Sequence, residues 1–218
     1  MHTCVSSMFQ LMTTVYLSAI YLATLASALP LDRCKSAISI FSSSGAYIES
    51  LNKSRVALPV LQKGFSTGHE MKFEFKTTSP NGVLFYMTPE RRQNELVALD
   101  IINGHPRYHI RCKQIEATLT LSRIRVDDGR WHKIVFRRRN NRGKLFVDRT
   151  PYFHDYRVDC GAFTSLTFGG VDPIQKYQNL QRELNTKRGH FLGCIRRVDV
   201  STGVEQSRAQ YHGVSECS

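Results

Sequence analysis

The chain has 218 residues, with 30 Lys and Arg side chains against 18 Asp and Glu, which gives a formal net charge of +12. A chain of this length can form one large β domain or two small domains. An excess of positive charge of this size favours anionic partners, which are nucleic acid, acidic lipid or sulfated glycan. The compartment in which the protein works decides among these three classes.

The first 28 residues have the pattern of a secretory signal peptide. Residues 8–25 are mostly apolar, and Ala26-Ser27-Ala28 supplies the small residues of a cleavage site, so we predict cleavage after Ala28. A membrane anchor is the alternative, because the apolar run is long. The Ser and Thr content of the run and its small-residue exit favour cleavage. No later stretch could span a bilayer, so we predict a secreted, extracellular protein, which argues against nucleic acid as the partner.

Residues 29–45 have the composition of a linker, since they end in Ser42-Ser43-Ser44-Gly45. We therefore place a single domain at residues 46–218. Asn52-Lys53-Ser54 is the only acceptor triplet for N-glycosylation, so Asn52 is predicted to lie at the surface of an exported glycoprotein.

Short strands separated by turn residues dominate this domain. Residues 71–75 alternate between apolar and charged side chains, which is typical of a half-buried strand, and Ser79-Pro80-Asn81-Gly82 forms a strong turn signal. Further strands are predicted at residues 83–87, 96–102, 108–112, 117–121, 131–136, 145–147, 166–168 and 191–200. Since no convincing long helix interrupts them, the pattern predicts an all-β sandwich.

A basic hairpin lies in the middle of the domain. In residues 131–136, Ile134 and Phe136 share one face of a strand, residues 140–143 form a short loop, and residues 145–147 bring the chain back. From Arg130 through Lys144 there are seven basic residues and no acidic one.

The guanidinium group suits sulfate, because its planar donors can bind two oxygens at once. We therefore predict a glycan-binding site on this hairpin, made of Lys133, Arg137, Arg138, Arg139, Arg142 and Lys144. The alternative is a solvated charged face that serves only solubility. The next candidates are the pairs Arg91-Arg92, Lys187-Arg188 and Arg196-Arg197.

Six motifs occur in a fixed order along the domain. They are Phe-Glu-Phe-Lys-Thr-Thr-Ser-Pro-Asn-Gly-Val-Leu-Phe-Tyr at 73–86, Glu-Leu-Val-Ala-Leu-Asp-Ile-Ile-Asn-Gly at 95–104, Val-Asp-Asp-Gly-Arg-Trp-His at 126–132, Leu-Phe-Val-Asp at 145–148, Phe-Gly-Gly at 168–170 and Phe-Leu-Gly-Cys-Ile-Arg at 191–196. Together these motifs resemble the laminin G domain, in particular the domains of laminin α chains and perlecan. The resemblance implies a two-sheet antiparallel jelly-roll sandwich that serves as a binding module rather than an enzyme.

The resemblance also implies a disulfide between Cys194, in its Gly-Cys-Ile-Arg motif, and Cys217 near the end of the chain. Export would place the five cysteines beyond the signal peptide in an oxidising compartment. The family alignment brings Cys112 and Cys160 to the same rim of the sandwich, where they are predicted to form a second disulfide. Cys34 is then left over and is the candidate for an interchain disulfide.

Many laminin G domains hold one calcium ion at this rim. The alignment gives Glu95 as the first side-chain ligand and places the second at Cys160, beside Asp159. Calcium prefers hard oxygen ligands, so a cysteine departs from the family pattern. Two alternatives stay open: calcium held by Glu95 and Asp159, or the Cys112–Cys160 disulfide in its place, which is the favoured one.

The predicted function is an extracellular-matrix or cell-adhesion module that recognises sulfated glycans such as heparin and heparan sulfate, or a glycosylated cell-surface receptor. A carrier that holds a small hydrophobic ligand between its sheets, as in relatives of sex-hormone-binding globulin, is the alternative. An enzyme is not expected, because no paired-acid motif appears and the histidines are scattered along the chain.

Overall fold

The computed structural model describes residues 38–49, 54–59, 69–88, 95–112, 115–139, 142–154, 163–170, 184, 190–201, 204 and 206–217. They all belong to one compact unit, Ile38–Ser218. The predicted signal peptide 1–28, Cys34, Asn52, Asp159 and Cys160 lie outside the described residues. No helix among the described residues is both long and apolar enough to cross a membrane.

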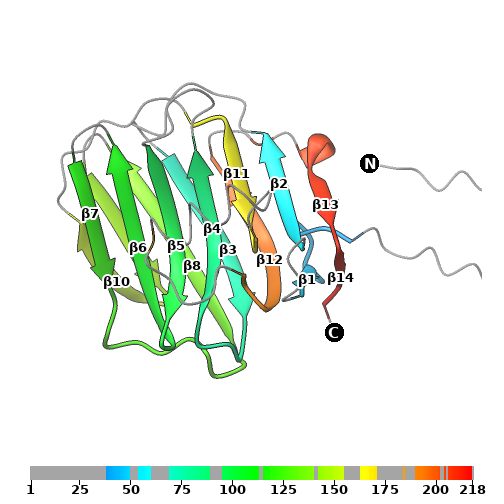
Figure 1. Ribbon diagram of the computed structural model, residues 1–218, viewed down its shortest axis with the longest axis horizontal. Helices are drawn as coiled ribbons and strands as arrows, with labels where there is room; N and C mark the ends of the chain where they lie inside the picture. Colours follow the sequence, from blue (N-terminus) through cyan, green and yellow to red (C-terminus); the bar gives the residue numbers. More distant parts are fainter. Residues whose placement is uncertain are drawn as a thin grey trace, which may run out of the picture. The chain divides into compact units, whose positions relative to one another are not determined.

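Fourteen strands among the described residues form two antiparallel sheets of seven strands each (Figure 1). The first sheet has the order β10-β9-β8-β3-β12-β1-β14, and the second has the order β13-β2-β11-β4-β5-β6-β7. The strands of the first sheet are β1 (Ala46–Ile48), β3 (His69–Lys76), β8 (Trp131–Arg139), β9 (Arg142–Val147), β10 (Thr150–His154), β12 (Gly193–Val200) and β14 (Val214–Glu216). The strands of the second sheet are β2 (Arg55–Pro59), β4 (Gly82–Thr88), β5 (Leu96–Ile102), β6 (His105–Cys112), β7 (Ile115–Thr120), β11 (Ser165–Phe168) and β13 (Gln210–His212).

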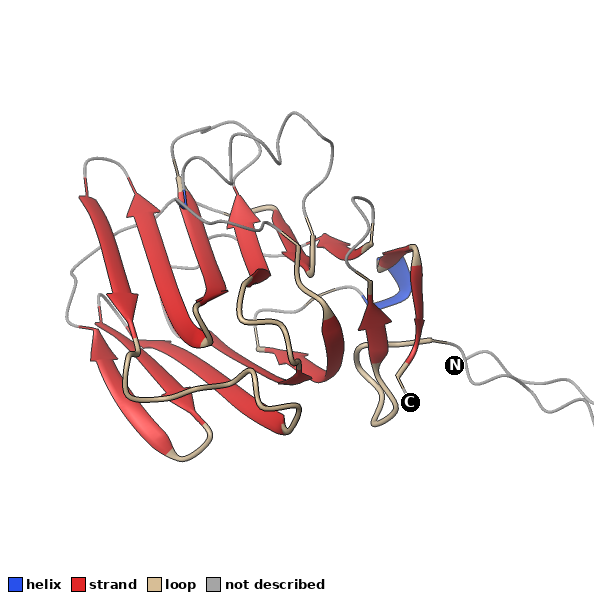
Figure 2. Cartoon of the chain, turned by 60° about the horizontal axis from the view of Figure 1, so that its bottom comes forward, coloured by secondary structure: helices blue, strands red, loops and turns tan. Residues whose placement is uncertain are grey.

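Strands make up almost all of the regular structure in the described part of the chain, which also includes the 3-10 turn η1 (Gln206–Arg208) (Figure 2). This confirms the predicted all-β sandwich of two antiparallel sheets. The strands predicted from the sequence at residues 71–75 and 131–136 lie within β3 and β8, which pair with each other.

The core lies between the sheets and is rich in aromatic side chains. Phe73 of the first sheet meets Phe85 and Phe168 of the second edge-on, with ring centroids 5.9 and 5.4 Å apart. Tyr108 and Phe136 stack across the same space at 5.2 Å. Ring pairs of this kind add about 0.5–1.5 kcal/mol each to the stabilisation from buried area.

The predicted linker boundary needs a correction, because residues 38–45 belong to the compact unit and not to the linker 29–45. Ile40 is wholly buried in the core, and its carbonyl accepts a hydrogen bond from the Val198 amide at 3.0 Å. The Ser42 hydroxyl donates to the Ser39 carbonyl at 2.7 Å and accepts from the Gly45 amide at 3.1 Å. The serine run therefore stabilises a turn of its own, which is why a packed segment had a linker-like composition.

Some strands are absent from the sequence prediction, and β10 shows why. Pro151 lies within β10, and proline usually argues against a strand because it cannot donate to the ladder. Among the described strands β10 lies at the edge of its sheet and pairs with β9, and an edge strand tolerates proline because only one of its sides needs ladder donors. Edge position cannot be read from local sequence.

Candidate functional site

In the first sheet, every second side chain along a strand faces away from the core. Phe73, Phe75, Ile134 and Phe136 are buried between the sheets. Since side chains alternate along a strand, the residues between them lie on the opposite face, which we call the outer face. On β3 these are Glu70, Lys72, Glu74 and Lys76, and on β8 they include Lys133 and Arg137.

The strand register divides the predicted hairpin site into two places. Lys144 of β9 lies opposite Arg137 of β8, which lies opposite Glu70 of β3. Lys133 lies instead opposite Glu74, four positions further along β3. Four residues of a strand span about 13 Å, so Lys133 lies too far away to form one cluster with Arg137 and Lys144.

The remaining three predicted residues are placed by their backbone only. Arg139 and Arg142 pair with each other at the end of the hairpin, and Arg138 pairs with Gly143. Their side chains lie outside what the structure describes. The backbone positions agree with a basic hairpin end next to Arg137 and Lys144.

Arg137 is held from two sides on the outer face. Its Nε donates a hydrogen bond to the Glu70 carboxylate, and its guanidinium carbon lies 5.5 Å from the centroid of the Phe146 ring. Lys72 also forms an ion pair with Glu70. Hydrogen bonds from Lys72 and Arg137 outweigh the effect of burial and hold the pKa of the Glu70 carboxyl below its usual value.

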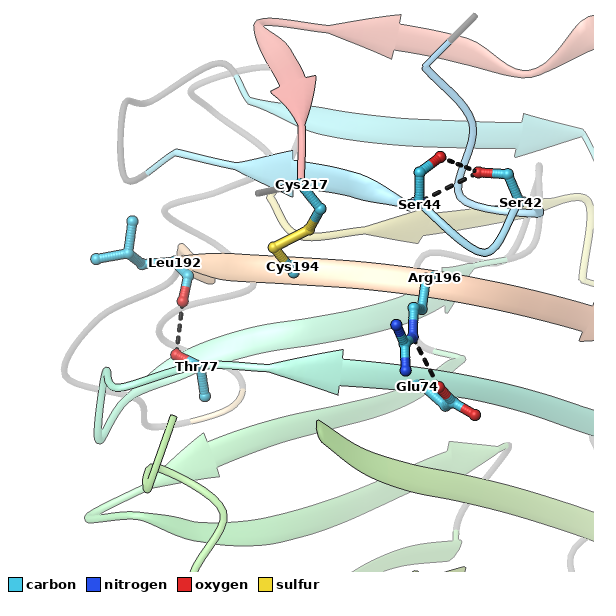
Figure 3. Close-up of a disulfide and its surroundings, with 9 residues drawn as sticks. Ser42, Ser44, Glu74, Thr77, Leu192, Cys194, Arg196 and Cys217 are labelled. Atoms are coloured by element: carbon cyan, nitrogen blue, oxygen red, sulfur yellow. Dashed lines mark hydrogen bonds and ion pairs between the residues drawn. A yellow bond between two sulfur atoms is a disulfide. The ribbon is translucent and has the colours of Figure 1, made fainter. Parts of the chain in front are cut away.

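Arg196 of β12 is held in the same manner at the other end of β3. Its Nε donates to Glu74 Oε2 at 2.8 Å, and its guanidinium carbon lies 3.7 Å from the centroid of the Trp131 ring. Figure 3 shows Arg196 reaching across to Glu74. Arg197 Nη1 donates to the other carboxylate oxygen at 3.1 Å. Burial alone would raise the pKa of the Glu74 carboxyl, but the hydrogen bonds from the two arginines lower it below its usual value.

A disulfide joins Cys194 and Cys217 beside this arginine, with their Cα atoms 5.8 Å apart (Figure 3). It is the pair that the family resemblance implies. In the same view the Thr77 hydroxyl donates to the Leu192 carbonyl at 2.6 Å, which fixes the chain just before β12.

The outer face has a clear excess of positive charge. Its described residues include seven basic and three acidic side chains. The basic ones are Lys72, Lys76, Lys133, Arg137, Lys144, Arg196 and Arg197, and the acidic ones are Glu70, Glu74 and Asp199. Arg196 was only a secondary candidate in the sequence analysis. Its contact with Trp131, 65 positions away, depends on the register of β8, β3 and β12 and has no local sequence signal.

His132 connects the turn before β8 with the turn between β9 and β10. Its Nδ1 lies 3.0 Å from Asp148 Oδ2, and its Nε2 lies 2.9 Å from Asp128 Oδ1. Burial lowers the pKa of His132, but hydrogen bonds to Asp148 and Asp128 more than compensate and raise it above its usual value. The doubly protonated ring can donate to both carboxylates, so this histidine has a structural role.

The proposed calcium rim is described only in part. Glu95 is buried directly before β5, and Cys112 is buried at the end of β6 with its sulfur in a disulfide. The partner of Cys112 lies outside the described residues, as do Asp159 and Cys160. The described residues contain no group of three or more His, Cys, Asp or Glu that could hold a metal ion. Both alternatives therefore stay predictions: calcium held by Glu95 and Asp159, and the Cys112–Cys160 disulfide in its place.

The second sheet carries a buried polar network that the sequence analysis missed. Asp100, with no exposed surface, accepts hydrogen bonds from Arg107 Nε at 3.1 Å and Nη2 at 2.6 Å, and its Oδ1 lies 3.1 Å from His109 Nε2. Arg107 also donates to the Leu184 carbonyl at 2.8 Å, and Thr118 Oγ1 lies 3.2 Å from His109 Nδ1. All three ionisable side chains are buried, and each is hydrogen-bonded within the domain. We assign the network a structural role rather than one in catalysis.

Comparison with known proteins decides the family. Residues 75–203, more than half of the chain, match the family model for the laminin G domain. The chain belongs to the laminin G domain family. This confirms the resemblance found in the sequence.

Three curated relatives show how this laminin G domain compares with longer proteins. It is 30% identical over 160 residues to neurexin 1 of Drosophila melanogaster, 24% over 190 residues to laminin subunit alpha of the same organism, and 28% over 180 residues to the basement membrane-specific heparan sulfate proteoglycan core protein of Mus musculus. The matches cover 68%, 82% and 78% of this chain, but only 8%, 5% and 4% of the relatives. The chain therefore spans less than a tenth of the length of these relatives.

Among solved structures, domains LG4-5 of the mouse laminin alpha1 chain superpose with a TM-score of 0.68 at 16% identity, over 83% of this chain and 48% of that one. The LG1-3 region of the laminin alpha2 chain gives a TM-score of 0.53 at 13% identity, over 79% and 31%. These similarities show that the laminin G sandwich is shared.

The carrier alternative needs room between the sheets. In the described part of the chain that space is filled by the aromatic core, including Phe73, Phe85, Phe136 and Phe168. A hollow of about 550 Å³ lies elsewhere, beside η1, and is lined by residues of β2, β11 and η1 such as Pro59, Ser165 and Ser207. The outer face of the first sheet is therefore the better candidate for the functional site.

Proposed function

We propose that this laminin G domain is a secreted extracellular-matrix or cell-adhesion module that binds sulfated glycans such as heparin and heparan sulfate. The observation that carries the proposal is the outer face, where seven basic side chains lie with only three acidic ones. Arg137 and Lys144, paired across β8 and β9, supply the centre of the hairpin end of this face.

The chemistry of a sulfate group fits this end of the face. Arg137 is 54% exposed, and charge-assisted hydrogen bonds of the guanidinium–oxyanion type contribute about 1.5–3 kcal/mol each. At 0.1 M salt, the attraction between exposed charges is largely screened beyond about 10 Å, and this distance shortens as salt is added. Glycan binding should therefore weaken as ionic strength rises. A glycosylated cell-surface receptor is the other partner expected for the same face.

Chromatography on immobilised heparin tests the proposal. The variant carries Arg137→Glu and Lys144→Glu, and the control carries Arg123→Glu and Arg208→Glu, two exposed arginines outside the strands of the first sheet. Both variants lose the same net charge. We expect the outer-face variant to elute at clearly lower salt than the wild type and the control to elute nearer the wild type. Equal elution of the two folded variants would mean that only net charge matters and that this end of the face is a solvated surface.

A further inference from the structure

Arg137 and Arg196 share one arrangement, although they lie on different strands. In each, Nε donates to a glutamate of β3, and an aromatic ring lies against the guanidinium group. The partners are Glu70 and Phe146 for Arg137, and Glu74 and Trp131 for Arg196.

This arrangement leaves the end of each guanidinium group available. The two carboxylates take only Nε, and among the described residues the terminal nitrogens of Arg137 and Arg196 donate no hydrogen bond. Those two terminal nitrogens can bind two oxygens of one sulfate or carboxylate side by side. Arg196 is 22% exposed, so solvent reaches it. An arginine side chain loses rotamer freedom when it is fixed, and here most of that loss precedes binding.

The spacing of the two arginines is set by β3. Both side chains reach a glutamate of that strand, and Glu70 and Glu74 lie four residues apart on the same face. Four residues correspond to about 13 Å along a strand. Lys72 lies between the two glutamates on the same face and adds positive charge there.

We propose that Arg137 and Arg196 are two preorganised anion receptors that hold two separate anionic groups of one sulfated chain lying along β3. The inference rests on the proposed function and names how the glycan runs over the outer face. A single small anion can occupy only one receptor, whereas a linear polyanion with repeated sulfate or carboxylate groups can occupy both. The second contact then forms within one complex and raises the affinity through effective concentration.

Size-graded heparin oligosaccharides, from disaccharide upward, test the inference by calorimetric titration at fixed salt. For the wild type we expect weak binding of the shortest chains and a rise of at least about tenfold in affinity at the first length that spans both receptors. Arg196→Lys keeps the charge but loses the paired donors, so it should abolish this step and leave the affinity for the shortest chains within about twofold, since Arg137 still serves them. Arg137→Lys should abolish the same step, and Arg123→Lys should change nothing.

Folding is checked on every variant by circular dichroism and thermal unfolding, because Arg196 also packs on Trp131. Arg137→Lys, whose parent side chain is half exposed, provides the second independent test. An affinity that rises smoothly with length in all proteins, or a step that survives both substitutions, would overturn the two-receptor arrangement while leaving glycan binding intact. A wild type that binds no heparin oligosaccharide would overturn both this inference and the proposed function.

Discussion

Removing the Cys194–Cys217 disulfide should destabilise the domain by an amount that the chain entropy predicts. The two cysteines are 23 positions apart, and closing a loop of that length lowers the entropy of the unfolded chain by an amount worth about 3 kcal/mol at 25 °C. The loop contains β13, which pairs in the second sheet, and β14, which pairs in the first. The disulfide thus limits how far the C-terminal strands can move away from β12 in the unfolded chain.

The variant is Cys194→Ala with Cys217→Ala, and urea and thermal unfolding followed by circular dichroism give its stability. For a domain of this size, a loss of about 3 kcal/mol lowers Tm by roughly 6 to 12 °C. The urea m-value should rise slightly, since the unfolded chain exposes more surface without the cross-link. Substitution is preferable to a reductant, because Cys112 is also in a disulfide that a reductant would break.

A loss below about 1 kcal/mol would refute the entropic reasoning, because loop closure alone predicts about three times that amount. It would show that the unfolded chain keeps structure between β12 and the C-terminal strands even without the covalent link. A loss far above 4 kcal/mol would point instead to packing around Cys194, which is almost fully buried.

Two further predictions concern buried charged groups. His132 has a raised pKa, so its stabilising effect is complete below its usual pKa and is lost as pH rises through the raised value. The difference in unfolding free energy between wild type and His132→Gln, measured in urea from pH 5.5 to 9, should therefore shrink as pH rises. A difference that grows with pH would contradict the role of Asp128 and Asp148. Asp100→Asn leaves Arg107 without its buried counter-charge and should cost about 3–5 kcal/mol in thermal and urea unfolding, whereas a cost below about 1 kcal/mol would mean that the guanidinium reaches solvent.

The fold could be predicted where local pattern and burial agree. In β3, the alternation of Met71, Phe73 and Phe75 with charged neighbours gives both the strand and its buried face. Strand β8 is similar, since Ile134 and Phe136 are buried and Arg137 is exposed. The family motifs then supplied the order of the elements, which periodicity alone does not provide.

The sequence prediction failed where tertiary position decides local structure. β2 (Arg55–Pro59) is short and ends in proline, yet it lies between β11 and β13 and forms part of the second sheet. The segment 38–45 looked like a linker because serine is common in linkers, but Ile40 fills the core and holds the segment in place. Gly45 is needed there, since it has φ of +81° and a Cβ atom would lie 2.6 Å from the Ile195 carbonyl oxygen.

The sequence predicted only part of the candidate site, because strand pairing decides which basic residues become neighbours. A run of basic residues is visible in the sequence, so Arg137 and Lys144 were predicted together, and the register confirms that they are neighbours. Lys133 belongs to the same run but lies about 13 Å along the sheet, because a strand carries its residues away at about 3.3 Å each. Arg196 reaches the same face only because β12 pairs with β3 from the other side.

The acidic residues of the outer face distinguish two explanations of glycan binding, a specific arrangement of arginines and positive charge alone. If charge alone mattered, Glu70 and Glu74 would weaken glycan binding, and replacing them by neutral residues would strengthen it. In the structure both carboxylates instead hold an arginine by Nε and turn its paired terminal donors away from protein partners in the described part of the chain. A freely rotating arginine would lose rotamer freedom when it binds an anion, whereas a fixed arginine has already lost that freedom in the unbound protein. In the proposed binding mode these glutamates therefore have a positioning role: they weaken the attraction for an anion but set the spacing between the two arginines.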